Sequence, residues 1–322
     1  MHSKSITDRH LAAAFADFSA AVPGGINLDD IPLARRMWNA LAMAKATTAP
    51  DIPGVTTSDH DAPGKDGPSV KVRIYQPEKR NATLPALLWI HGGGWILGDI
   101  HTEDLRAKSL SSDLNCVVAS VEYRLAPEHP FPAALEDCYA ALRWLANSAE
   151  QFGVNAERIA VGGESAGGNL AAGLCLMARD RAEVRICYQF LNGPPLDDMG
   201  MESSELSDME SPVLTRAQGM TAWRSYLHQK PGSEDISAYA APVRAANLSG
   251  LPPTCISIGA RDLLCIENLV YAQRLIKAGV STELHVYAES FHGFDMFAPQ
   301  ADASKRCLAE YKHLLYRALH GY

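Results

Sequence analysis

Ser165 is the residue whose surroundings most clearly predict chemistry. It is the centre of Gly-Glu-Ser-Ala-Gly at residues 163–167, between a predicted strand at residues 158–161 and a predicted helix at residues 165–179. Small residues on both sides allow a sharp strand-to-helix turn that exposes the serine, and the free N–H groups of the helix point at it. A glycine-rich turn without chemistry is the alternative, but the flanking strand and helix favour a nucleophile.

A second glycine run can supply hydrogen-bond donors to the same reaction. His-Gly-Gly-Gly-Trp at residues 91–95 directly follows a predicted apolar strand at residues 85–90. Because Gly92 and Gly93 have no side chains, their backbone N–H groups can approach a ligand closely. We expect these two groups, together with the N–H of Ala166, to stabilise negative charge that develops on a substrate oxygen.

A serine nucleophile needs a base and a carboxylate that orients the base. His292 and Asp262 are the candidates, because each lies a few residues after a predicted strand. The carboxyl ends of parallel strands are where such sheets place their sites, and the order Ser, Asp, His is the one that accompanies a serine turn of this kind. The other candidates lie in less suitable places. His285 is inside a predicted strand, His313 and His320 are in the last helix or tail, and Glu267 is within another helix.

The elements that position these residues alternate between strands and helices from about residue 70 onward. Strands are predicted at residues 70–75, 85–90, 116–121, 158–161, 185–191, 254–258 and 283–287, and helices at residues 133–146, 165–179, 266–278 and 303–319. Several of the strands are continuously apolar, as in a parallel sheet that helices cover on both faces. The alternation predicts an α/β fold with a mostly parallel central sheet flanked by helices.

Three regions depart from this alternation. Residues 1–50 carry two predicted helices with apolar stripes, and residues 51–68 are rich in Pro, Gly, Thr, Ser and Asp, which predicts a connecting loop. Residues 193–247 contain an acidic stretch and a helical pattern at residues 217–228, but no convincing strand. We interpret this last segment as an insertion, which on such sheets usually lies over the ligand-binding edge.

Composition narrows the classes of partner and cofactor. Hydrophobic residues make up 47% of the 322 residues, and the formal net charge of −8 argues against binding to nucleic acid or to an anionic membrane. The chain has no apolar run long enough to span a bilayer and no secretion signal at its start, so a cytoplasmic location is expected. The glycine runs do not have the spacing of nucleotide-binding motifs, and the His and Cys residues do not have the spacing of metal sites. We therefore expect no cofactor and no metal.

Four ordered motifs make the chain similar to the hormone-sensitive-lipase family of bacterial carboxylesterases. They are His-Gly-Gly-Gly-Trp at residues 91–95, Tyr-Arg-Leu-Ala-Pro-Glu at 123–128, Gly-Glu-Ser-Ala-Gly-Gly-Asn at 163–169 and Phe-His-Gly at 291–293. Within the family, the chain most resembles esterases of the heroin-esterase type. The resemblance implies an α/β-hydrolase fold, a catalytic triad and an oxyanion hole, made by Ser165, Asp262 and His292 and by Gly92, Gly93 and Ala166.

The resemblance also implies a division of the chain. Residues 1–50 and 193–247 would form a helical cap, and residues 51–192 and 248–322 the α/β-hydrolase core. Members of the family are often dimers, so a homodimer is an expectation of the same kind.

These observations predict a serine carboxylesterase that hydrolyses small, short-acyl-chain esters through an acyl-enzyme intermediate. Its partner would be a small-molecule ester, with Trp95 and Glu164 as substrate-binding residues and Trp38 as a further candidate for the pocket wall. An amidase or lactonase with the same triad is the nearest alternative. A non-catalytic protein that binds a ligand under its cap is an alternative from another class, but such proteins typically lose a member of the triad.

Overall fold

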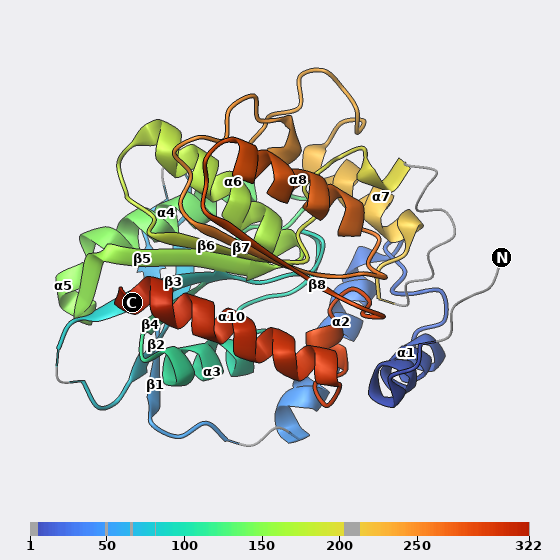
Figure 1. Ribbon diagram of the computed structural model, residues 1–322, viewed down its shortest axis with the longest axis horizontal. Helices are drawn as coiled ribbons and strands as arrows, with labels where there is room; N and C mark the ends of the chain where they lie inside the picture. Colours follow the sequence, from blue (N-terminus) through green and yellow to red (C-terminus); the bar gives the residue numbers. More distant parts are fainter. Residues whose placement is uncertain (1–5, 49–50, 65–66, 81, 203–212, 322) are drawn as a thin grey trace.

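The computed structural model describes residues 6–48, 51–64, 67–80, 82–202 and 213–321. In this part of the chain, an eight-stranded sheet has the order β1-β2-β4-β3-β5-β6-β7-β8 (Figure 1). The strands are Val55–Ala62 (β1), Val70–Pro77 (β2), Leu84–Ile90 (β3), Val117–Val121 (β4), Val154–Glu164 (β5), Tyr188–Asn192 (β6), Thr254–Gly259 (β7) and Thr282–Tyr287 (β8). β2 is antiparallel to both of its neighbours, and all pairs from β4 to β8 are parallel. The predicted mostly parallel α/β sheet is confirmed.

Helices cover both faces of this sheet. The helices of the described residues are Arg9–Ala21 (α1), Ile31–Thr48 (α2), Asp104–Leu114 (α3), Ala133–Asn147 (α4), Ala149–Phe152 (α5), Ala166–Arg181 (α6), Arg216–Leu227 (α7), Cys265–Lys277 (α8), Phe294–Phe297 (α9) and Asp302–His320 (α10). In Figure 1, α3 and α10 lie on one face of the sheet, and α4, α6 and α8 lie on the other. The continuously apolar β3 packs on both faces of the sheet, because its neighbouring residues Leu88 and Trp89 belong to two different buried clusters.

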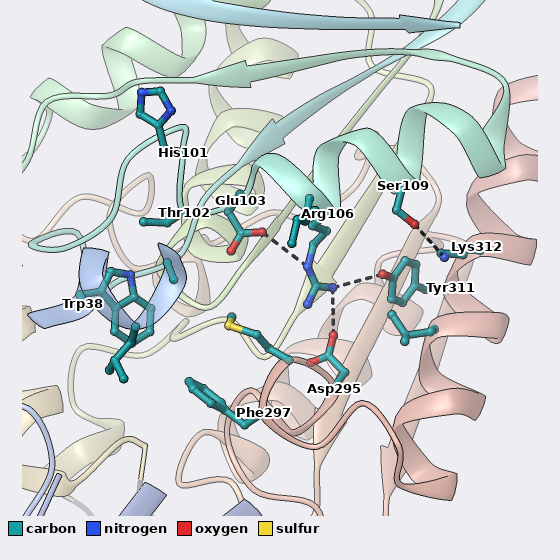
Figure 2. Close-up of a pocket in the computed structure, with 15 residues that line it drawn as sticks. Trp38, His101, Thr102, Glu103, Arg106, Ser109, Asp295, Phe297, Tyr311 and Lys312 are labelled. Carbon is teal, nitrogen blue, oxygen red and sulfur yellow. Dashed lines mark hydrogen bonds and ion pairs between the residues drawn. The ribbon is translucent and has the colours of Figure 1, made fainter. Parts of the chain in front are cut away.

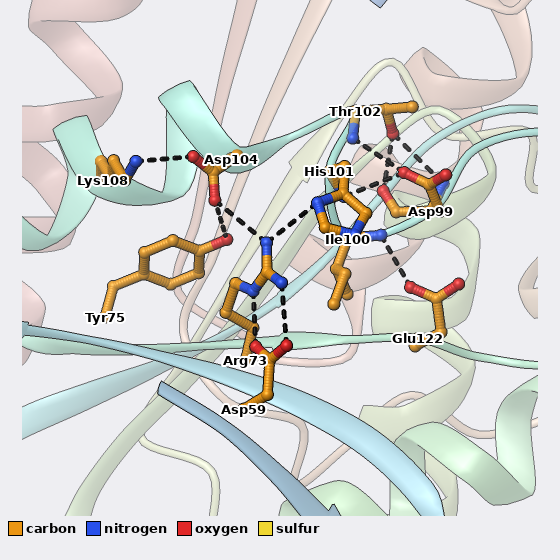
Figure 3. A network of polar contacts seen from close by, with 10 residues as sticks. All are labelled: Asp59, Arg73, Tyr75, Asp99, Ile100, His101, Thr102, Asp104, Lys108 and Glu122. Atoms are coloured by element: carbon orange, nitrogen blue, oxygen red, sulfur yellow. Dashed lines mark hydrogen bonds and ion pairs between the residues drawn. The ribbon is translucent and has the colours of Figure 1, made fainter. Parts of the chain in front are cut away.

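The predicted loop at residues 51–68 is wrong in part, because Val55–Ala62 form β1. This edge strand pairs with β2 along all eight of its residues, and most of its side chains are exposed. Its pairing is reinforced by Arg73 of β2, whose guanidinium donates to the Asp59 carboxylate at 2.6 and 2.9 Å (Figure 3). Backbone pairing and a charge contact therefore hold a strand whose polar sequence resembles that of a loop.

Helix α3 was likewise not predicted, because its sequence is polar. Its first residue, Asp104, accepts a hydrogen bond from the Tyr75 hydroxyl at 2.9 Å and forms an ion pair with Lys108 at 2.8 Å (Figure 3). A carboxylate in the first turn suits the positive end of the helix dipole. The buried face of α3 is narrow, with Ala107, Leu110, Ser111 and Leu114 facing the sheet side of the helix.

The other predicted strands and helices are confirmed, with ends that differ by a few residues. Among the described residues of the predicted insertion there is α7 and no strand. Helix α7 begins with a capping box formed by Thr215 and Gln218, and the Gln218 side chain donates to the Ile26 carbonyl at 2.7 Å. Helices α1, α2 and α7 thus lie at the same end of the molecule (Figure 1). Residues 203–212, which hold three residues of the acidic stretch, lie outside the described residues.

Candidate active site

Three side chains that the sequence singled out meet at the carboxyl ends of three parallel strands. Ser165 follows β5 directly, Asp262 lies three residues after β7, and His292 lies five residues after β8. The His292 Nε2 is 2.9 Å from the Ser165 Oγ, and its Nδ1 is 2.7 Å from the Asp262 Oδ2. Both Asp262 and His292 are buried, so water competes little for these contacts.

The turn that carries Ser165 depends on its two flanking glycines. Ser165 has φ +53° and ψ −122°, a strained conformation at the start of α6. A Cβ at Gly163 would lie 2.4 Å from the Gly167 carbonyl carbon, and a Cβ at Gly167 would lie 2.0 Å from the Ile90 carbonyl oxygen. Only glycine therefore lets β5, α6 and the end of β3 approach this closely, and Ser165 stays half-buried at the bend.

Asp262 has a second contact that fixes its orientation. Its Oδ1 accepts a hydrogen bond from the Leu264 N–H at 3.0 Å, while its Oδ2 faces His292. Burial lowers the pKa of His292, but Asp262 and, more weakly, Glu164 and Asp295 raise it, so that the pKa lies above its usual 6.5. The rival carboxylate Glu267 faces elsewhere, since it accepts hydrogen bonds from the Leu196 and Asp197 N–H groups.

The glycine loop after β3 lies against the serine turn. A Cβ at Gly92 would be 3.0 Å from the Glu164 carbonyl oxygen and 3.5 Å from the Ser165 Cβ. Gly93 has φ +115°, and its carbonyl accepts from the Leu97 N–H at 2.8 Å. Tyr123 holds the start of the loop in place. Its hydroxyl donates to the His91 carbonyl at 2.9 Å, and its ring stacks on the His91 imidazole.

Comparisons with known proteins identify the family of this chain. The family described as alpha/beta hydrolase fold matches residues 87–296, about two thirds of the chain. The chain belongs to this family. Carboxylesterase NlhH of Mycobacterium tuberculosis is 35% identical to the hydrolase over 309 residues, which cover 91% of this chain and 94% of the relative. Esterase LipI of the same organism is 34% identical over 305 residues, covering 94% and 93%.

Among solved structures, a bacterial heroin esterase superimposes on the hydrolase with a TM-score of 0.91. It is 40% identical, and the match covers 97% of this chain and 99% of that one. The resemblance to the hormone-sensitive-lipase family, and to its heroin-esterase type, is thereby confirmed. With these relatives, the chain is a carboxylic ester hydrolase.

A cavity of about 90 Å³ opens at Ser165. Its wall includes Ser165, His292, the three glycines of the loop, and side chains from α2 and α7. Trp38 of α2 lines it, as the sequence suggested. Trp95 does not, which corrects its predicted place at the substrate: φ +61° turns the residue away from the cavity, and its buried ring stacks on Tyr226 with centroids 4.3 Å apart.

Glu164 lines the cavity, and its carboxylate belongs to a buried charge cluster that the sequence did not reveal. The Arg106 guanidinium lies at its centre, 2.9 Å from Asp295 and 3.5 Å from Glu103 (Figure 2). It also lies 3.2 Å from Glu164. Burial raises the pKa of Glu164 to about 8, although Arg106 opposes the rise. Arg106 therefore joins the residue before Ser165 to the segment that follows His292. No local motif signals Arg106, because Glu164 and Asp295 come from distant segments and only Glu103 lies nearby in the sequence.

The described residues contain no group of three or more His, Cys, Asp or Glu side chains that could hold a metal ion. In the same part of the chain, we find no helix with the length and apolarity needed to cross a membrane.

Proposed function

We propose that the hydrolase cleaves small esters by a two-step acyl-enzyme route in which Ser165 is the nucleophile. The observation that carries this proposal is the unbroken series of contacts from the Ser165 Oγ through His292 to Asp262. His292 takes the serine proton while the Oγ attacks the carbonyl carbon, and it then gives that proton to the leaving alcohol. A water molecule, activated by the same imidazole, adds to the acyl-enzyme and releases the acid.

The tetrahedral intermediate needs donors for its oxyanion. The N–H groups of Gly92 and Gly93 are proposed for this role, because their loop packs on the serine turn and lines the same cavity. The N–H of Ala166 is the third proposed donor, since the first N–H groups of a helix lack intrahelical acceptors. Asp262 holds the His292 tautomer in which Nε2 is free to accept the serine proton.

Substrate size is inferred from the cavity. A volume of about 90 Å³ next to Ser165 suits a short acyl chain better than a long one. Residues 1–50 and 193–247 are proposed to form the cap over this cavity, because Trp38 and residues of α7 contribute to its wall. The homodimer and the cytoplasmic location stay predictions.

The test is hydrolysis of a series of chromogenic esters by the wild type and by Ser165→Ala. We expect turnover that falls with acyl length and drops on the order of 10³-fold or more in the variant. Ser249→Ala, at an exposed position, is the matched control and should retain wild-type rates. Activity that survives Ser165→Ala would refute the mechanism, and a matched amide that turns over as fast as its ester would favour an amidase.

A further inference from the structure

Arg35, on helix α2, contacts two segments that are distant from it in sequence. Its Nε donates to the Ile96 carbonyl at 2.8 Å, and its Nη2 donates to the Ala126 carbonyl at 3.0 Å. Its two outer nitrogens also donate to the two oxygens of the Glu128 carboxylate, at 2.9 and 2.7 Å. One guanidinium therefore bridges the glycine loop after β3 and the end of the Tyr-Arg-Leu-Ala-Pro-Glu motif at residues 123–128.

The Ile96 carbonyl belongs to the turn that closes the glycine loop. In this turn, the Gly93 carbonyl accepts hydrogen bonds from the N–H groups of Ile96 at 3.1 Å and Leu97 at 2.8 Å. The Trp95 carbonyl accepts from the Ala126 N–H at 2.9 Å, so the turn and the motif are joined at this point as well. Both Ile96 and Ala126 are buried, and a buried carbonyl needs a hydrogen-bond donor. The guanidinium supplies a donor to each of them.

A displacement of this turn would reach the proposed oxyanion donors. A Cβ at Gly93 would lie 2.2 Å from the Leu97 carbonyl oxygen, so the two ends of the turn are in close contact. The backbone of Gly93 is thus coupled to the positions of Ile96 and Leu97. We propose that Arg35 is a positioning residue, which holds this turn so that the N–H groups of Gly92 and Gly93 face the substrate carbonyl; this inference rests on the proposed function.

The arrangement of the acceptors requires a guanidinium. A lysine ammonium lacks the planar fork with which arginine donates in fixed directions to several acceptors. The Glu128 side chain is 53% exposed, so its ion pair with Arg35 contributes little by itself. The contacts with the two buried carbonyls are the ones that we expect to matter, because a buried carbonyl that loses its donor is costly. Glu128 orients the guanidinium between them, which gives a role to the acidic end of the motif at residues 123–128.

Helix α2 offers a second route from Arg35 to the site, and the two routes can be told apart. Trp38, on the same helix, lines the cavity at Ser165. The Asn39 side chain donates to the Asp99 carboxylate at 2.9 Å, so α2 keeps a contact with the loop after the glycine run when Arg35 is replaced. Displaced oxyanion donors lower the turnover of every ester by a similar factor. A displaced Trp38 instead changes how turnover depends on acyl length.

The experiment measures kcat and KM of Arg35→Met and Arg35→Lys on p-nitrophenyl acetate and p-nitrophenyl butyrate. We expect both variants to lower kcat at least about tenfold on both esters with KM nearly unchanged, because the oxyanion donors act in the transition state. Arg36→Met, at the exposed next position of α2, is the matched control and should keep wild-type values. Circular dichroism during heating measures the Tm of each variant.

Three results would overturn the proposal. The first is wild-type kcat in Arg35→Lys, because the ion pair with Glu128 would then suffice. The second is a lowered Tm with unchanged kcat, which is the result of a purely structural contact. The third is a loss confined to the butyrate ester, which would place the effect at Trp38. If Arg35→Met does not fold, Arg35→Lys, which keeps the charge, decides. A wild type that hydrolyses neither ester, or activity that survives Ser165→Ala, would instead refute the proposed function.

Discussion

The largely buried guanidinium of Arg106 is the charge whose removal we expect to destabilise this fold most. Arg106→Met keeps the length of the side chain but removes the guanidinium that at present lies 2.9 Å from Asp295, 3.2 Å from Glu164 and 3.5 Å from Glu103, all of them buried. A pair of unit charges 2.9 Å apart, as for Arg106 and Asp295, is worth about 6 kcal/mol at an effective dielectric constant of about 20, and the cost of desolvation offsets part of this attraction. Breaking a buried pair by removing one partner costs about 3–5 kcal/mol.

This loss converts into a change of melting temperature. The entropy of unfolding is about 2.1 cal/mol/K per residue near 60 °C, or about 0.7 kcal/mol/K for the 322 residues of the chain. A loss of about 3–5 kcal/mol therefore lowers Tm by about 4–7 °C. Circular dichroism during heating, together with a urea titration, measures both quantities.

The stability that Arg106→Met loses relative to the wild type should depend on pH, which gives a second test. Burial raises the pKa of Glu164 from 4.5 to about 8 in the folded state, so the wild type loses stability as pH rises through this range. Arg106 lowers that pKa, and in its absence the folded-state pKa lies higher. The variant then continues to lose stability above pH 8, where the loss in the wild type levels off. We expect a larger deficit at pH 9 than at pH 7.

Arg143→Met is the matched control for this experiment. The Arg143 side chain is 44% exposed and has one ion pair, with Glu183 at 3.5 Å. Its removal should change the free energy of unfolding by less than about 0.5 kcal/mol, as is usual for surface pairs. Equal unfolding midpoints for the two variants, or a deficit of Arg106→Met that narrows at pH 9, would refute the reasoning.

Two further predictions concern ester turnover. The base must be neutral and Asp262 raises the pKa of His292, so the acidic midpoint of the kcat/KM profile should lie above pH 6.5; a midpoint well below 6 would contradict this. Gly93→Ala would place a Cβ 2.2 Å from the Leu97 carbonyl oxygen at φ +115°, which displaces the loop that carries the proposed oxyanion donors. Steady-state ester assays should then show kcat lowered at least about tenfold, and wild-type kcat would show that the loop does not contribute.

The positions of Ser165, Asp262 and His292 could be predicted because their signals are local. Each follows an apolar run, and parallel strands bring their carboxyl ends to one edge. The same reasoning missed β1 (Val55–Ala62), whose sequence Val-Thr-Thr-Ser-Asp-His-Asp-Ala has no apolar alternation. That strand exists because β2 offers it a complete antiparallel partner, which is information held by another segment.

Trp95 shows how a local signal can mislead. It follows the glycine loop directly, and adjacency in sequence suggested a place at the substrate. Its φ is positive, and its ring packs away from the cavity against Trp223 and Tyr226 of α7. Direction at such a bend is decided by tertiary packing, so the types of the neighbouring residues do not predict it.

Arg106 marks the limit of sequence reasoning at this site, and also explains how the site is held. Glu164 immediately precedes Ser165, and Asp295 follows His292 by three residues, so a single guanidinium contacts both segments whose side chains meet at 2.9 Å. The glycine turn determines the shape of the serine bend, but the distance between serine and imidazole depends on how two separate loops are placed. The spacing of Ser165 and His292 is therefore expected to depend in part on a residue that no local motif signals.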